Sequence, residues 1–162
     1  VSIPAQVVNQ LGGLNCVQTD YNNDGFKDVL IVRGAWLTDT MSMRPTLLKN
    51  NGDMTFTDVT YEAKLDEPVN SISGTWADYD NDGWLDLFIC CEQQPSRLYH
   101  NLRDGTFEEV SHTAGIATHP FHLCKGANWL DYDNDGWIDL FLNYLSDEGP
   151  QLYRNNGDRT FS

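Results

Sequence analysis

The sequence lacks any long hydrophobic run. None of its apolar stretches approaches the ~20 residues that a membrane-spanning helix requires. Basic residues are also scarce: 10 Lys and Arg stand against 24 Asp and Glu, which gives a net charge of −14 over 162 residues. Nucleic acids and anionic membrane surfaces are polyanions, so both are poor partners for this chain. We therefore expect no nucleic-acid partner and no membrane insertion, and we look for cations as ligands.

Catalytic motifs are missing as well. The sequence has no Gly-x-Ser-x-Gly elbow and no phosphate-binding loop, and its cysteines form no Cys-x-x-Cys pair. Carboxylates are abundant, but acid–base hydrolysis of a glycoside needs one acid held in an apolar pocket, and no sequence feature selects one. We therefore predict that the protein is not an enzyme.

One acidic string occurs three times, at residues 20–28, 78–86 and 131–139. A second string of the form Asn-x-x-Asp-x-Thr-Phe follows each copy, at residues 50–56, 101–107 and 155–161. Two independent markers that recur in phase indicate a true internal repeat. Repeats of this length are typical of propeller blades or of helical arrays.

The segments around the two strings decide between these architectures. Short apolar runs rich in β-branched and aromatic residues follow the acidic strings at 28–32, 86–90 and 139–143, and they predict strands buried on both faces. Further strands are predicted before the acidic strings, at 14–19, 72–77 and 125–130, and around the second string, at 46–49 and 55–60 in the first repeat. The pairs Asn51-Gly52, Asp104-Gly105 and Asn156-Gly157 are expected to supply the positive φ angles of tight hairpins.

Each repeat is therefore predicted to form one four-stranded antiparallel blade of an all-β β-propeller. We assign residues 1–162 to a single propeller segment, with blades over about 12–60, 70–111 and 123–162. Propellers typically close with 4–8 blades. We accordingly expect the open blade faces to be covered by further blades of the same protein or by other copies of the chain.

The acidic strings have the chemistry of calcium loops. Each has Asp at positions 1, 5 and 9, Asp or Asn at position 3, and Gly at position 6, where a sharp turn is needed. Calcium takes 6–8 oxygen ligands, and a backbone carbonyl at position 7 can add to the side chains; Mg²⁺ is less suited because it demands tighter geometry. The predicted ligands of three Ca²⁺ sites are Asp20, Asn22, Asp24, Phe26 and Asp28; Asp78, Asp80, Asp82, Trp84 and Asp86; and Asp131, Asp133, Asp135, Trp137 and Asp139.

Two other interpretations of these strings are less consistent with the sequence. An EF-hand would place a bidentate Glu at position 12, but Ile31, Ile89 and Leu142 stand there, inside apolar strands. The second interpretation is that the strings form solvated surface turns, as a single Asp-Asn-Gly string usually does. Eleven of the 24 acids lie in these loops, however, while the remaining acids nearly balance the bases, so the charge is concentrated where a cation would bind.

The two strings together resemble FG-GAP/VCBS repeats, the calcium-binding blades also found in integrin α-subunit propellers. The fuller pattern, from residues 12–15 through 33–36 to 47–53, is similar to the ASPIC/UnbV group of bacterial proteins related to cartilage acidic protein. The resemblance covers nearly the whole chain and implies calcium at the residues named above. It departs from the family pattern at Asn22, at Met54 and Arg159, and at Leu102-Arg103, and it lacks the Phe-Gly and Gly-Ala-Pro signatures of the integrin repeats.

Cysteine and tryptophan allow two interpretations each. The four cysteines, Cys16, Cys90, Cys91 and Cys124, permit disulfides in an oxidising compartment, but we expect buried free thiols. Cys90 and Cys91 should point to opposite faces of their strand. Trp76, Trp84, Trp129 and Trp137 flank the second and third loops. We expect them to pack between blades, with stacking on sugars as the alternative.

The sequence thus predicts a calcium-binding propeller module. Its expected role is a structural and recognition scaffold for protein or glycan partners, outside the cytoplasm, because loops of this type suit millimolar calcium. That location is extracellular or periplasmic. The alternative is a propeller enzyme acting on polysaccharides, with calcium in a supporting role.

Overall fold

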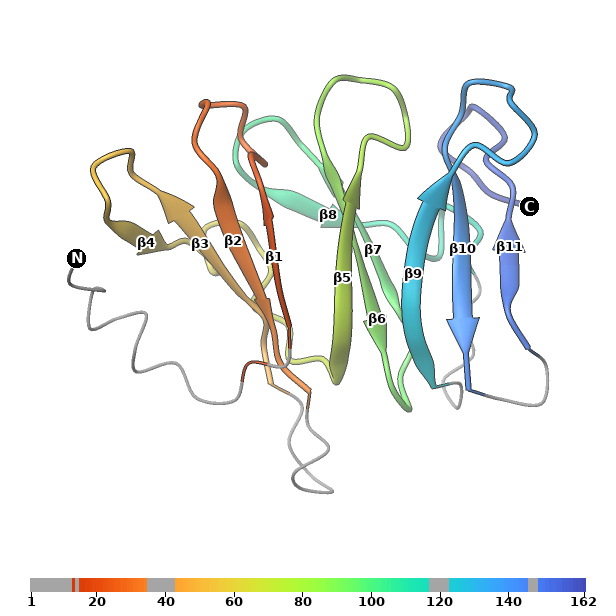
Figure 1. Ribbon diagram of the computed structural model, residues 1–162, viewed down its shortest axis with the longest axis horizontal. Coiled ribbons are helices and arrows are strands. Elements are labelled where there is room, and N and C mark those ends of the chain that lie inside the picture. Colours follow the sequence, from red (N-terminus) through yellow and green to blue (C-terminus); the bar gives the residue numbers. More distant parts are fainter. Residues whose placement is uncertain (1–12, 14, 35–42, 117–122, 146–148) are drawn as a thin grey trace.

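The computed structural model describes residues 13, 15–34, 43–116, 123–145 and 149–162, which form eleven strands in three antiparallel sheets (Figure 1). The first sheet contains β1 (Asn15–Thr19), β2 (Asp28–Val32), β3 (Thr46–Asn50) and β4 (Phe56–Asp58). The second contains β5 (Ser71–Ala77), β6 (Asp86–Cys91), β7 (Arg97–Asn101) and β8 (Phe107–Glu109). The third contains β9 (Cys124–Leu130), β10 (Asp139–Tyr144) and β11 (Gln151–Tyr153). The described part of the chain has no helix with the length and apolar character of a membrane span.

The all-β prediction is confirmed, and each sheet is consistent with one propeller blade. In the first two sheets the strands pair in sequence order, as a meander. The prediction of a fourth strand in the third sheet is wrong for the described residues, where that sheet has three strands. A single bridge between Asn155 and Phe161 marks the place of the missing strand, because only one residue pair closes the last hairpin.

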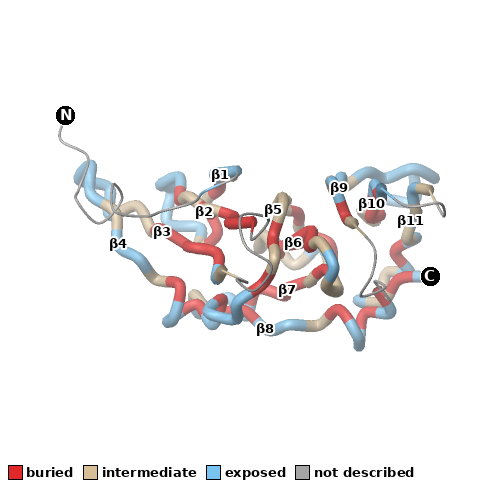
Figure 2. The backbone as a smooth tube through the Cα atoms, turned by 90° about the horizontal axis from the view of Figure 1, so that it is seen from below, coloured by how far each residue is buried: buried red, intermediate tan, exposed pale blue. Residues whose placement is uncertain are grey.

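The three sheets stand side by side, and their facing surfaces form two apolar cores (Figures 1 and 2). Leu30, Val32 and Leu47 of the first sheet pack with Leu87 and Ile89 of the second. The opposite face of the second sheet, with Phe88 and Leu98, packs against Leu140 and Leu142 of the third. Burial on both faces, expected for all three post-loop strands, therefore holds throughout only in β6, since β2 and β10 include half-buried or exposed residues.

Two tryptophans pack between blades, as expected. Trp76 contacts the first core and lies 5.9 Å from Phe107, measured between ring centroids. Trp129 contacts the second core and stacks on Tyr79 with 6.4 Å between ring centroids. Trp137 differs, because its ring covers Gly157 in the hairpin of its own blade.

The positive φ angles of the three hairpin turns lie at partly different residues from those expected. Gly52, Gly105 and Gly157 do have positive φ, but the Asn or Asp before each glycine does not. The second positive angle lies two residues away, at Met54, Arg103 and Arg159 respectively. Each hairpin therefore has two left-handed positions separated by an Asp, and glycine takes one of the two.

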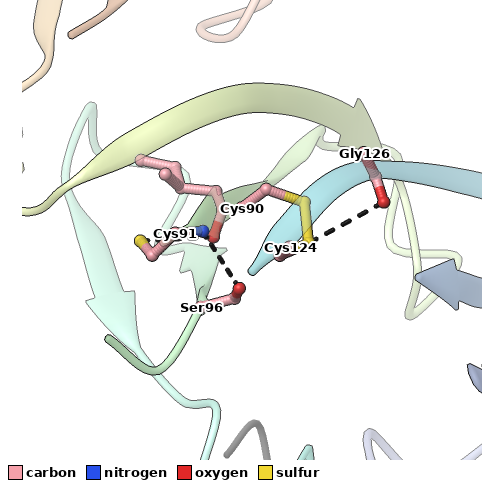
Figure 3. Close-up of a disulfide and its surroundings, with 6 residues drawn as sticks. Cys90, Cys91, Ser96, Cys124 and Gly126 are labelled. Carbon is pink, nitrogen blue, oxygen red and sulfur yellow. Dashed lines mark hydrogen bonds between the residues drawn. A yellow bond between two sulfur atoms is a disulfide. The ribbon is translucent and has the colours of Figure 1, made fainter. Parts of the chain in front are cut away.

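The expectation of free thiols is wrong for two of the four cysteines. Cys90 on β6 and Cys124 on β9 form a disulfide that joins the second blade to the third (Figure 3). Cys91 is a buried free thiol, and Cys16 is free but exposed. Cys90 and Cys91 do face opposite sides of β6, one in each core. The pairing arises because adjacent blades bring the two Cα atoms to 5.3 Å, a relation that sequence spacing does not show.

Candidate metal centres

The three acidic loops are the β1–β2, β5–β6 and β9–β10 connections, and they lie along one edge of the molecule, uppermost in Figure 1. Each loop turns through an Asn at position 4 with φ between 54° and 60°, at Asn23, Asn81 and Asn134. The glycine at position 6 has φ 88° in all three loops. This is a backbone conformation that L-residues rarely adopt, which explains the glycine in each string.

The first Asp of each string closes its loop. The Asp78 carboxylate accepts hydrogen bonds from the backbone N–H groups of Asp82 (2.9 Å) and Gly83 (2.8 Å). Asp20 and Asp131 accept the equivalent pairs of bonds in the other loops. These hydrogen bonds curl each loop on itself, and in the second loop ligand atoms of Asp78, Asp80 and Asp82 lie within 4.8 Å of one another.

The last Asp of each string is buried and holds the loop to the neighbouring hairpin. Asp86 accepts from the backbone N–H of Tyr79 (3.3 Å) and of Asn101 (2.8 Å). Asp28 and Asp139 make the same two contacts in their blades. Burial, together with nearby Asp80, raises the pKa of Asp86 to about 8, although the hydrogen bond from Asn101 opposes the shift.

Among the described residues, three groups of side chains bring ligand atoms within 4.8 Å of one another. They are Asp78 with Asp80 and Asp82; Asp80 with Asp86 and His100; and Asp131 with Asp133 and Asp139. In the first loop the Asn22 amide donates to Asp24 at 3.0 Å. Three acidic clusters in the second and third loops thus could hold metal ions. The full fifteen-residue ligand set, with the carbonyls of Phe26, Trp84 and Trp137, stays a prediction.

Asp80 provides the test of whether a cation fits. Its side chain is 3% exposed, and neither carboxylate oxygen has a hydrogen-bond partner among the described residues. Arg159 Nε lies 2.9 Å from Oδ2 but out of hydrogen-bond alignment. Burial and the charge of Asp82 raise the pKa of Asp80. A buried carboxylate without donors is costly, and a bound cation would supply the missing charge.

Basic side chains that the sequence analysis did not single out line the same loops. The residue before each hairpin Asn is Lys49, His100 or Arg154. Lys49 lies 3.4 Å from Asp24, and Arg154 pairs with Asp133 and Asp135 at 2.7 Å each. In the second loop Arg103 pairs with Asp82 at 2.6 Å. The repeat alignment could have found this position, because all three copies place a basic or imidazole side chain there.

Asparagines connect successive loops. Asn23 of the first loop donates to the carbonyl of Gly83 in the second (3.1 Å), and Asn81 donates to the carbonyl of Gly136 in the third (3.2 Å). The first and second loops are therefore each tied to the loop of the next blade. The three acidic loops form one hydrogen-bonded row along the edge of the structure.

A family model of the FG-GAP-like repeat matches residues 20–89 and 78–142. The chain belongs to the FG-GAP-like repeat family. Each FG-GAP-like match begins at the first Asp of an acidic loop and ends in the strand after the next loop, so the family unit spans the boundary between two blades. Human cartilage acidic protein 1 is 31% identical over 115 residues, which cover 67% of this chain and 17% of that protein. This FG-GAP-like chain thus spans only a small part of the length of that relative.

Proposed function

We propose that the three acidic loops each bind Ca²⁺ and that the chain serves as a calcium-stabilised structural and recognition module. Asp80 carries this proposal, because its buried carboxylate has no hydrogen-bond donor among the described residues and lies beside three other acidic side chains of its loop. The ligands would be the Asp or Asn at positions 1, 3, 5 and 9. The ion would neutralise carboxylates that otherwise repel one another.

The ions are proposed to hold shape and not to perform chemistry. Asp20, Asp78 and Asp131 are engaged by backbone N–H groups of their own loops, and the buried position-9 carboxylates join each loop to its hairpin. These contacts support a role in fixing strand connections. Metal-assisted hydrolysis would instead need an open coordination position beside a general base. We therefore propose no enzymatic activity.

The location proposed is extracellular or periplasmic. The Cys90–Cys124 disulfide favours an oxidising compartment. Millimolar calcium outside the cytoplasm suits loops of this type. The two arguments are independent, since the disulfide lies on the strands and contributes no calcium ligand.

Partners are proposed for two surfaces. The loop edge would recognise a protein or a glycan, and the outer face of the third blade would be covered by a further blade or another copy. Leu130, Phe141 and Leu152 share the face of that sheet opposite Leu140 and Leu142, and Leu130 and Leu152 are 40% and 43% exposed. Exposed apolar side chains on one sheet face support such an interface.

Calorimetry with calcium on chelator-treated protein tests the proposal. We expect three Ca²⁺ ions to bind per chain and to raise the melting temperature substantially. Mg²⁺ added in place of Ca²⁺ should raise it much less. A ligand that binds only the folded state adds about 2.7 kcal/mol at 100 times its Kd. Asp135→Ala should remove one ion and lower stability together. The proposal fails if chelation leaves the melting curve unchanged, or if Asp135→Ala abolishes an activity on acidic polysaccharides while the fold and two ions persist.

A further inference from the structure

The second loop differs from the other two in the side chain that reaches into it from the hairpin. At this position the first and third blades have Lys49 and Arg154, which carry positive charge and no lone pair for a metal. The second blade has His100, whose neutral imidazole is a metal ligand. His100 is 7% exposed, and its ring packs edge-on against Tyr79 at 6.2 Å between centroids, so its orientation is fixed.

The ring nitrogen of His100 faces two carboxylates. Nδ1 lies 3.0 Å from Oδ1 of Asp86 and 3.7 Å from Oδ2 of Asp80. Donor atoms around a tetrahedral zinc ion, with bonds of about 2.0–2.1 Å, are separated by roughly 3.3 Å. The three side chains therefore already stand at separations that one small divalent ion could bridge.

Asp80 gives a second, independent indication of a ligand. Its buried carboxylate points into this group, and no residue in the described part of the chain donates a hydrogen bond to it. Arg159 of the third blade lies 2.9 Å from Oδ2 of Asp80, but its side chain is half-exposed and can turn into solvent. Asp86 also accepts backbone hydrogen bonds from Tyr79 and Asn101, which fix its orientation.

We propose that Asp80, Asp86 and His100 form a mixed carboxylate–imidazole site for a divalent transition ion of the Zn²⁺ class, specific to the second blade. Imidazole nitrogen favours such ions over calcium, which prefers oxygen alone. The site shares Asp80 and Asp86 with the second calcium loop, so it rests on the proposal that this loop binds a cation. Zn²⁺ is expected to displace calcium there and to leave the other two calcium ions in place.

The test titrates Zn²⁺ into the calcium-loaded chain and counts both metals after gel filtration. We expect one zinc per chain, with calcium falling from three ions to two. His100→Asn keeps an amide donor near Asp86 but removes the imidazole, and it should weaken zinc binding by at least ~100-fold while three calcium ions remain. His100→Arg copies the third blade and gives a second folded variant with the same expected loss.

Matched controls separate the outcomes. The other three histidines of the sequence provide these controls, because they are not part of the proposed site. His112→Asn should retain the zinc, and so should the double variant His119→Asn with His122→Asn. Zinc that persists in His100→Asn and His100→Arg, or that is lost in the controls, would overturn the inference while leaving the calcium proposal intact. A wild-type chain that binds three calcium ions and no zinc would overturn it equally. Binding of neither metal would instead refute the calcium proposal itself.

Discussion

Asn101, in the second blade, donates its side-chain amide to the backbone carbonyl of Tyr21 in the first blade, at 2.8 Å and across 80 positions of sequence. The same amide donates to the carbonyl of Leu85 in its own blade at 3.0 Å. Asn155 repeats both contacts one blade later, to Tyr79 and Ile138. In the second and third hairpins one buried asparagine thus joins its own acidic loop to the acidic loop of the preceding blade.

Replacing Asn155 by Ala should therefore weaken the boundary between the second and third blades. The variant removes the donor from the buried carbonyl of Tyr79 and from the part-buried carbonyl of Ile138, and an unsatisfied buried carbonyl costs about 1–3 kcal/mol of unfolding free energy. Urea unfolding of the calcium-loaded protein measures the loss. Asn50→Ala is the matched control, because the amide of Asn50 donates to Lys27 in its own blade at an exposed position. Equal losses in the two variants would contradict the role of Asn155 between blades.

Of the three proposed calcium sites, the first should be the weakest. Its third position is Asn22, whereas the second and third loops have Asp80 and Asp133 there, and affinity in such loops is tuned partly by ligand charge. Asn22→Asp should therefore tighten the first site, and Asp133→Asn should weaken the third. Calorimetric titration resolves the sites by comparing the two variants with the wild type. The prediction is wrong if Asn22→Asp leaves the weakest binding step unchanged.

Glycine is required at one hairpin position for two separate reasons. A Cβ at Gly157 would lie 2.9 Å from Cε2 of Trp137, and φ there is 76°. Gly105 has a φ of 88°, but a Cβ at that position would meet no other atom within 4 Å. Both Ala variants should lose about 1–2 kcal/mol from backbone conformation, and Gly157→Ala should lose about 1–3 kcal/mol more from overpacking. Thermal unfolding of the two variants measures the difference. Similar melting temperatures would contradict the prediction, because they would show that the Trp137 ring can move away from the added Cβ at no cost.

The disulfide should also stabilise the boundary between the second and third blades, at the opposite end of the strands from Asn155. Cys90 and Cys124 are 34 positions apart, and closing a loop of that length contributes about 3–4 kcal/mol in the chain-entropy model. Cys124→Ser should lower the melting temperature markedly, and added reductant should have no further effect on it. Cys16→Ser serves as the control, because Cys16 is free and exposed. A Cys124→Ser variant that melts like the wild type would refute the expected stabilisation.

The sequence predicted most strands because their signals are local. The apolar run after each acidic string reappears as β2, β6 and β10, with bounds that differ by at most one residue. The spacing of Asp, Asn and Gly likewise located the loops that contain the acidic clusters. In these segments the period of the side chains and the demand for positive φ are set by neighbours in the chain.

Features that depend on which strands and side chains meet in space were not predictable in this way. The pairing of Cys90 with Cys124 requires knowing that β6 and β9 are adjacent in space. The place of His100 beside Asp80 and Asp86 depends on the register of β7 against β6. The short last hairpin of the third sheet reflects a single bridge where two other blades form three residue pairs.

The amide contacts of Asn101 and Asn155 run in one direction, each from a later hairpin back to an earlier loop. During synthesis an acidic loop therefore leaves the ribosome well before the asparagine that secures it. At roughly 5–20 residues per second, 80 residues correspond to a delay of about 4–16 s. The acidic loops of the first and second blades therefore gain these contacts only after the hairpin of the following blade has been synthesised.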